Sequence, residues 1–234
     1  MYNNHFAIND IAVLFIDNCH LLGITHKKQV DVLARAIGSK GRYISEVRYI
    51  GNVFAKIAKN LKELSKKYNI VIVCGGVGMF HNYMPQAFAN TFDCVLEENP
   101  KAMKYFQEFL RKNELVYDDS YKQTVMLPTN SRVLLNEVTG SFGFQYANVF
   151  TIPNDNAFKI LCEKIATILC DGHKKYMYSV PLSKNVLHFY SEIAKAGEFF
   201  SDVTIDITAY EIILVSENLE QLEWCQDVVK KIIS

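Results

Sequence analysis

Apolar runs of strand length, separated by segments of helical periodicity, constrain the fold of this chain more than any other feature. Ile11–Asp17 begins with six apolar residues, Ile70–Cys74 is apolar throughout, and Tyr43–Ile50 alternates like a strand. Between them, apolar residues recur at helical spacing within Val30–Ile37 and Val53–Leu64. Strands that are apolar on both sides and alternate with helices are typical of a parallel sheet covered on both faces. The sequence therefore predicts an α/β fold with a mainly parallel sheet.

The rest of the chain divides into further elements and a second domain. We expect helices over Gln86–Phe92, Pro100–Arg111 and Ala157–Leu169, a loop over Asn113–Gln123, and strands over Val133–Asn136 and Asn148–Ile152. The short polar stretch Asp171–Lys175 suggests a boundary, with one domain over residues 1–172 and another over residues 173–234. The second domain reads as a small β-α-β-β-α unit of the α+β class, with elements over Tyr176–Val180, Lys184–Ala196, Val203–Ala209, Glu211–Ser216 and Leu219–Ile233.

Composition argues against several classes of partner. The 25 basic residues equal the 25 acidic ones, so no global field attracts nucleic acid or an anionic membrane. The apolar runs are too short to span a bilayer, and the N-terminus lacks the pattern of a signal peptide. Six scattered cysteines without metal-ligand spacing read as small buried side chains in a reducing compartment. We therefore expect a cytoplasmic protein with no nucleic-acid or membrane partner.

The segment "IVIVCGGVGMFHNY" carries the main candidate site. Gly75, Gly76 and Gly78 directly follow a buried strand. Glycines there permit positive φ and close approach of backbone N–H groups to an anion, and ligands of such sheets bind beyond the carboxyl ends of strands. The motif lacks the full dinucleotide fingerprint and the Lys-Ser/Thr of a nucleotide P-loop. Phosphate or nucleotide binding and a plain tight turn remain equally open on these residues alone.

Longer segments resemble the molybdopterin-binding (MoCF-type) domain family. "VIVCGGVGMFHNYMPQAFANTF" is similar to the family's G-G-[VI]-G-P-T-H-D-D turn and the helix after it, and "VMLPTNSRVLLNEVTGSFGFQYANVFTIPNDN" is similar to its second loop. "AVLFIDNCHLLG" falls where the family has a strand ending in G-D-E-[IL]-L-x-G. The small C-terminal unit resembles the domain that follows this fold in CinA-like proteins and in the N-terminal half of animal-type FAD synthases. The resemblance is closest to the FAD-synthase branch.

This resemblance implies a ligand, a metal and site residues. The ligand would be a nucleotide or pterin, FAD-like in chemistry, and Mg²⁺ or another divalent metal would be held by acidic residues. The phosphate- or ligand-binding residues would be Gly75, Gly76, Gly78, Asn82, Thr139, Gly140, Ser141 and Gly143. Asp17 and His81 would be catalytic, with His81 assisting proton transfer, and Asp17 and Asp155 would hold the metal. Relatives of this type commonly self-associate, so a homo-oligomer is expected.

The acidic motif is degenerate, which divides the functional prediction. Where the family has T-H-D-D this chain has Phe80, His81, Asn82 and Tyr83, and losing two carboxylates should severely weaken Mg²⁺ binding. The sequence therefore favours a non-catalytic or weakened nucleotide- or pterin-binding module, a candidate pseudoenzyme. The alternative is a divalent-metal-dependent pyrophosphatase acting on FAD or a related nucleotide diphosphate. The family places adenylyl transfer to FMN in a separate domain, for which this chain leaves no room.

Several of these residues also have a purely structural interpretation. Asp17 can cap a turn at the end of its strand, and His81 can be a hydrogen-bonded turn residue. His20 and His26 lie in a predicted polar loop, where solvated histidines are more common than metal ligands. The rings of Phe80 and Tyr83 can stack on a ligand or fill a closed site.

Overall fold

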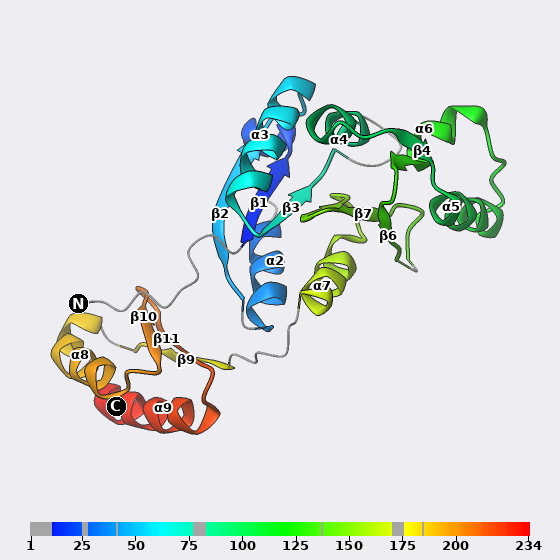
Figure 1. The fold of residues 1–234 in the computed structure, drawn as a ribbon. Coiled ribbons are helices and arrows are strands. Elements are labelled where there is room, and N and C mark those ends of the chain that lie inside the picture. The colour runs from blue at the N-terminus through cyan, green and yellow to red at the C-terminus, as the bar shows by residue number, and fades with distance from the viewer. Residues whose placement is uncertain are drawn as a thin grey trace. The chain divides into compact units, whose positions relative to one another are not determined.

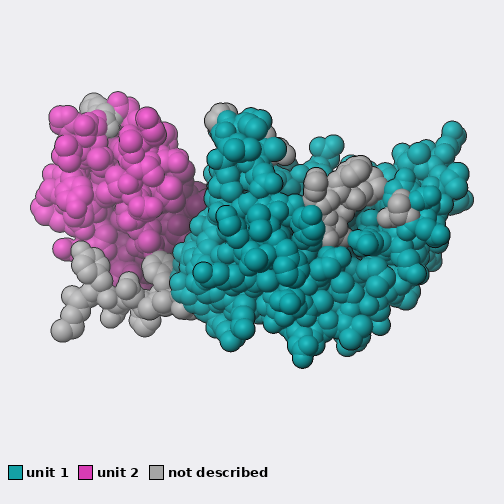
Figure 2. Space-filling view, turned by 90° about the horizontal axis from the view of Figure 1, so that it is seen from above, with its two compact units in different colours: residues 1–34, 43–168 teal, residues 35–42, 169–234 magenta. Residues whose placement is uncertain are grey.

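The chain forms two compact units, which Figure 2 shows in two colours. The computed structural model describes residues 11–24, 28–40, 42–76, 83–136, 138–169, 176–183 and 185–234. Unit 1 comprises Met1–Ala34 and Tyr43–Ile168, and unit 2 comprises Arg35–Arg42 and Leu169–Ser234. The predicted domain boundary between residues 172 and 173 falls outside the described residues and stays a prediction.

Unit 1 is built around a mixed sheet, as the sequence predicted. Its strands are β1 (Ile11–Ile16), β2 (Ile44–Ile50), β3 (Ile70–Cys74), β6 (Arg132–Leu134), β7 (Gly143–Tyr146) and β8 (Val149–Ile152). Their order is β2-β1-β3-β8-β7-β6. The first four run parallel, while β7 and β6 extend the sheet as antiparallel strands. All six residues of β1 are buried, because this strand has a neighbour on each side and a helical layer on each face (Figure 1).

Helices lie on both faces of this sheet. The α-helices that begin in unit 1 are α1 (Asn18–Leu21), α2 (Gln29–Gly38), α3 (Phe54–Lys67), α4 (Met84–Phe92), α5 (Pro100–Lys112), α6 (Lys122–Val125) and α7 (Phe158–Ile168). Residues of α3, α4 and α5 share one core with alternate residues of β1 and β3. The opposite face meets α7, whose Cys162 lies close enough to Cys74 of β3 to influence its titration.

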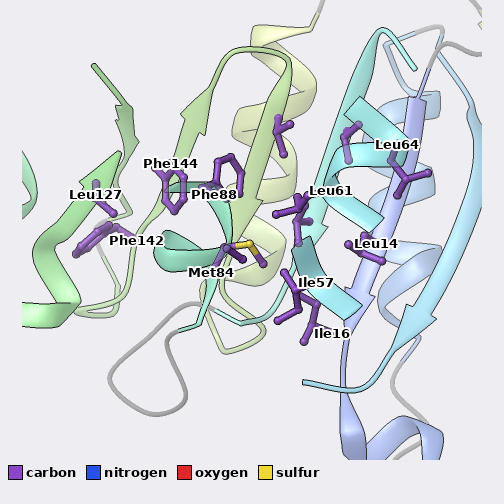
Figure 3. Packing of buried hydrophobic residues seen from close by; sticks show 14 of the residues in the cluster. Leu14, Ile16, Ile57, Leu61, Leu64, Met84, Phe88, Leu127, Phe142 and Phe144 are labelled. Atoms are coloured by element: carbon purple, nitrogen blue, oxygen red, sulfur yellow. The ribbon is translucent and has the colours of Figure 1, made fainter. Parts of the chain in front are cut away.

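Large apolar side chains fill the core on the α3–α4 face (Figure 3). Leu14 of β1 and Leu61 of α3 are completely buried there. Phe88 of α4 packs its ring edge-on against Phe144 of β7, with the ring centroids 5.0 Å apart. The edge-to-face arrangement adds a favourable quadrupole interaction to the burial of apolar area. Phe88 therefore ties α4 to the antiparallel part of the sheet.

A polar network joins the edge strand β2 to α3. Arg48 donates to Asn60 at 3.0 Å and to Glu63 at 2.8 Å, and it also pairs with Glu46. Glu46 accepts from Lys67 at 2.9 Å and from the Tyr68 hydroxyl. The bond from Tyr68, followed by those from Lys67 and Arg48, lowers the pKa of Glu46 from 4.5 to about 2. Charge-assisted hydrogen bonds thus join the more exposed side of α3 to the edge strand, beside the apolar packing of Leu64.

Several local predictions differ from the structure. The predicted loop over Asn113–Gln123 contains a 3₁₀ turn, η1 (Asp119–Tyr121), and its end enters α6. The antiparallel pair β4 (Leu96–Glu98) and β5 (Met126–Pro128) had no predicted counterpart. Each of these strands has only three residues, too few for an alternation signal.

Unit 2 is a small α+β unit, as predicted. Its strands β9 (Tyr176–Pro181), β10 (Thr204–Ile207) and β11 (Glu211–Ser216) form an antiparallel sheet in the order β10-β11-β9. The helices are η2 (Val186–His188), α8 (Tyr190–Phe199) and α9 (Leu219–Ile233). The predicted helix over Lys184–Ala196 is therefore divided into η2 and α8, while the predicted bounds of α9 are confirmed.

Within the described parts of the chain, no helix has the length and apolar character needed to span a bilayer.

The Leu61→Ala variant tests the core on the α3–α4 face. Leu61 is fully buried, so the variant should lower the free energy of unfolding by about 2–5 kcal/mol. Leu115→Ala is the matched control, because Leu115 is 53% exposed and its truncation should change stability by less than about 0.5 kcal/mol. Urea unfolding followed by far-UV circular dichroism measures both. Equal effects of the two variants would contradict the packing described above.

The pH dependence of stability tests the network around Glu46. Because its pKa is lower in the folded chain, ionised Glu46 stabilises the fold above pH about 4.5, and this contribution is lost as the pH falls towards 2. Glu46 is partly exposed, so the expected contribution is about 1–2 kcal/mol. The stability difference between the wild type and Glu46→Gln should be constant near neutral pH and shrink in that acidic window. Tyr68→Phe should reduce the pH dependence; an unchanged profile would contradict the proposed cause.

Candidate functional site

Polar residues and glycines gather where the parallel strands end. Asp17 follows β1, Asn52 comes two residues after β2, Gly75 follows β3, and Asn154 and Asp155 come shortly after β8. The carboxyl ends of parallel strands meet at one edge of a sheet, which is where ligands of open α/β sheets bind. We call Asp17, Gly75, Gly76, Asn154 and Asp155 the carboxyl-end site.

The two described glycines of the site form a tight turn. Gly75 has φ +94° and Gly76 has φ +69°, both in the left-handed region that favours glycine. A Cβ on Gly75 would lie 2.5 Å from the Ile16 carbonyl oxygen at the end of β1. The Gly75 N–H donates to the Ile152 carbonyl oxygen at 2.9 Å, so it is already bonded within the protein. The need for glycine at position 75 thus follows from packing, whether or not a ligand binds.

Asp17 is held by two hydrogen bonds within the protein. Its Oδ1 accepts from the His20 N–H at 3.0 Å and so caps α1, which agrees with the turn-capping interpretation. Its Oδ2 accepts from Asn154 Nδ2 at 3.1 Å. One carboxylate therefore caps α1 and also connects the end of β1 to the end of β8.

Asn154 presents a buried oxygen that has no hydrogen-bond partner among the residues that the structure describes. A carboxylate accepts hydrogen bonds, so the bond to Asp17 fixes which end of the Asn154 amide is the nitrogen. Its Oδ1 therefore points away from Asp17, and it is buried and unpaired. The side-chain oxygens of Asn52 and Gln86 are also buried and unpaired. Buried acceptors without donors are rare and unfavourable in folded proteins, so this edge is suited to a ligand that donates hydrogen bonds.

The loop around Thr139 and Ser141 is closed by its own hydrogen bonds. Asn136 Oδ1 accepts from the Thr139 N–H at 2.8 Å, and the Ser141 N–H donates to Thr139 Oγ1 at 3.3 Å. The Ser141 hydroxyl donates to Asp155, whose other oxygen accepts from the Ala157 N–H at 2.8 Å. Two N–H groups of the predicted anion cradle are therefore already bonded, although ligand binding there stays a prediction.

Gly140 and Gly143 have packing reasons of their own. A Cβ on Gly140 would lie 2.4 Å from the Phe109 ring. Gly143 is not in the predicted turn but begins strand β7, where a Cβ would lie 2.1 Å from the Thr151 carbonyl oxygen. Packing alone therefore explains why glycine stands at both positions, and no bound anion is needed to explain it.

The described residues do not fit a divalent metal site well. Asp17 and Asp155 both use their carboxylates in bonds within the protein. Within the described ranges, no three His, Cys, Asp or Glu side chains form a group that could hold a metal ion. Mg²⁺ and Ca²⁺ require several oxygen ligands, so no catalytic step through a metal can be derived from this arrangement.

Other candidate residues have varied positions. Gly78, His81 and Asn82 lie outside the described residues, as do Phe80 and His26. Tyr83 is described and is 45% exposed. The prediction for His20, a solvated loop histidine, was wrong: it lies in α1, and its ring stacks on Tyr49 with the centroids 4.3 Å apart.

Three of the described cysteines have thiols that are unsuited to act as nucleophiles. Cys74, Cys162 and Cys225 are buried and Cys19 is exposed. Burial raises the pKa of Cys162 to about 12 and that of Cys225 to about 11, and it raises the pKa of Cys74 well above its usual value. Reactive thiols need a lowered pKa, so these three are structural.

Comparison with known families identifies the fold of unit 1. A family model described as a probable molybdopterin binding domain, MoCF_biosynth, matches residues 12–164. The chain belongs to this family. The resemblance read from the two loop segments is thereby confirmed at the level of the family.

Several solved structures are similar to this chain. The protein CinA, of unknown function, from Thermoplasma acidophilum is similar with a TM-score of 0.60 and 15% identity, over 68% of this chain and 96% of that chain. A molybdopterin biosynthesis protein from Mycobacterium abscessus matches with a TM-score of 0.42 and 10% identity, over 69% of this chain and 91% of that one. The tungsten cofactor synthesizing protein MoaB from Pyrococcus furiosus has a TM-score of 0.40 and 11% identity, over 69% and 92%. The similarity to CinA shows a shared fold and nothing about function. A search of curated proteins finds no match.

Sequence reasoning missed the asparagines of this MoCF-type site. Asn18 Oδ1 accepts from the Asn52 N–H at 2.9 Å, which links the ends of β1 and β2, and Asn154 links β8 to Asp17. The available signal was an amide residue within two positions of the end of each of these parallel strands. The sequence-based prediction of the site rested mainly on carboxylates and glycines.

The contrast between Gly75→Ala and Gly23→Ala tests the glycine turn. Gly23 has φ +69° and nothing within 4 Å of a Cβ, so its substitution should cost only the left-handed conformation, about 1–2 kcal/mol. Gly75→Ala adds the clash with Ile16 and should cost a further 1–3 kcal/mol, approximately. Urea unfolding of both variants measures the difference. Equal destabilisation would show that the turn is not packed against β1 as described.

Proposed function

We propose that this MoCF-type chain is a non-catalytic or weakened module, related to the FAD-synthase branch, that binds a nucleotide or pterin at the carboxyl-end site. The observation that carries the proposal is the state of the two carboxylates. Asp17 is bonded to His20 and Asn154, and Asp155 is bonded to Ser141 and Ala157. Carboxylates held in this way act as structural acceptors, which favours binding over metal-dependent hydrolysis.

The unpaired acceptors support a ligand with N–H donors. Asn154 Oδ1 is oriented by Asp17, and within the described ranges neither it nor the buried Asn52 Oδ1 has a donor. Leaving such groups unsatisfied costs about 1–3 kcal/mol each, which a bound donor would recover. Nucleotide bases and pterins carry ring N–H or amino groups of this kind. The glycine turn lies at the same edge of the sheet, where a phosphate of the same ligand would be placed.

The alternative function is a divalent-metal-dependent FAD pyrophosphatase. It is favoured by the position of Asp17 and Asp155 at the ends of β1 and β8, on the edge where family ligands bind. It requires both carboxylates to exchange their present bonds for Mg²⁺ or another divalent metal. Asp17 would then hold the metal, and His81 would assist proton transfer.

We also infer a cytoplasmic location. The cysteines that the structure describes are all free, and three of them are buried among apolar side chains. Unpaired buried thiols are typical of proteins from reducing compartments. The absence of a basic surplus supports a small-molecule ligand over nucleic acid.

Calorimetry and a hydrolysis assay test the proposed function together. Titration with FAD, FMN, ADP and a pterin should give measurable heat with at least one ligand, while FAD mixed with protein and Mg²⁺, Mn²⁺ or Co²⁺ should yield no FMN and AMP above the buffer rate. Asn154→Ala should weaken binding about three- to tenfold, because it removes one neutral acceptor. Asn113→Ala, on the exposed C-terminal end of α5, is the control and should bind normally.

Each other outcome rejects part of the proposal. FAD hydrolysis that disappears in Asp17→Ala would establish the pyrophosphatase instead. Absence of heat with all four ligands would reject the binding function and leave a structural domain. Normal binding by Asn154→Ala would remove Asn154 from the site.

A further inference from the structure

Unit 2 carries a cluster of aromatic rings at its surface, where α8 and α9 lie side by side (Figure 1). The ring centroid of Trp224 is 5.3 Å from that of Phe199 and 5.1 Å from that of Phe200, and both pairs are edge-to-face. Phe200 is buried, but Phe199 is 66% exposed and Trp224 is 51% exposed. Two large rings packed on each other and left open to solvent are typical of an interaction surface.

The same face of α9 is acidic. Glu220 and Asp227 share a helical face with Trp224, because they lie four residues before it and three after it. Glu223 lies next to this face, three residues after Glu220 and four before Asp227. All three carboxylates are exposed, and none has a hydrogen bond or ion pair with another residue that the structure describes. Over residues 176–234 the sequence has nine acidic residues against four lysines. We call Phe199, Trp224 and these carboxylates the acidic aromatic face.

A matching basic face lies on α3. Lys59, Lys62 and Lys66 are exposed along one side of this helix, with the same spacing of three and four residues as Glu220, Glu223 and Asp227. These lysines likewise form no ion pair with a described residue. The helix begins with Phe54, which is 40% exposed, after Val53, which is 49% exposed. These apolar residues lie on other sides of the helix than the lysines, so the α3 face consists of the row of positive charge.

We propose that the acidic aromatic face of one copy binds the α3 face of a second copy of this chain. The charges have opposite sign and equal spacing along the two helices, and the exposed rings of Phe199 and Trp224 would be covered by the lysine side chains, whose charged ends can lie over aromatic faces. A contact between two acidic aromatic faces would place carboxylates against carboxylates, so the symmetric alternative is disfavoured. Such a contact is heterologous and produces a ring or an open chain of copies.

The fluorescence of Trp224 measures this association directly, because it is the only tryptophan of the chain. As the protein concentration rises, emission should shift to shorter wavelength while sedimentation velocity detects species larger than the monomer. Raising the ionic strength from about 0.05 M to about 0.5 M should weaken the association about tenfold, because exposed charge pairs are screened. Tyr210→Ser, at an 82% exposed position between β10 and β11, is the control and should associate like the wild type.

A charge swap identifies the two faces. Lys59→Glu/Lys62→Glu and Glu220→Lys/Glu223→Lys should each abolish association alone, because each double variant places like charges opposite one another. An equimolar mixture of the two variants should restore the emission shift and the larger species. A monomer at all concentrations would overturn the proposal. Association that persists in either variant alone, or a mixture that stays monomeric, would also overturn it by showing that these faces do not pair.

Discussion

The carboxyl-end site depends on the hydrogen bond that Gly75 makes to Ile152. This bond joins the ends of β3 and β8, while the missing side chain of Gly75 lets the turn pass within van der Waals distance of Ile16 at the end of β1. Three parallel strands thus end at nearly the same level. Asp17 and Asn154 follow two of these strands and can therefore reach one another. The same bond that fixes the fold also determines which polar groups the site presents.

The chemistry of the site follows from how those polar groups are already bonded. A carboxylate that caps a helix and binds an asparagine stabilises the fold, but it has fewer lone pairs left for a metal ion. The amide that binds it acquires a fixed orientation and a free oxygen. The described part of this edge therefore presents neutral acceptors beside carboxylates that are already bonded. This arrangement is the physical basis for proposing binding without efficient turnover.

Charge acquires a pattern only when residues are assigned to elements. The charges cancel over the whole chain, so net charge alone suggests no interaction. Once residues are assigned to helices, the lysines of α3 and the carboxylates of α9 become two rows of opposite sign. Exposed aromatic rings accompany the acidic row, which distinguishes that face from ordinary solvated surfaces.

The sequence by itself determined the elements whose signals are local and repeated. Apolar runs identified β1 and β3, helical periodicity identified α3 and α9, and quoted loop segments identified the family. Short strands such as β4 and β5 could not be found in this way, since each exists only because its partner, far away in sequence, supplies the hydrogen bonds. The tertiary structure alone decided which groups of the site remain available. Whether the carboxylates of Asp17 and Asp155 are free or already bonded depends on residues 137 and 14 positions away, and no local pattern encodes those pairings.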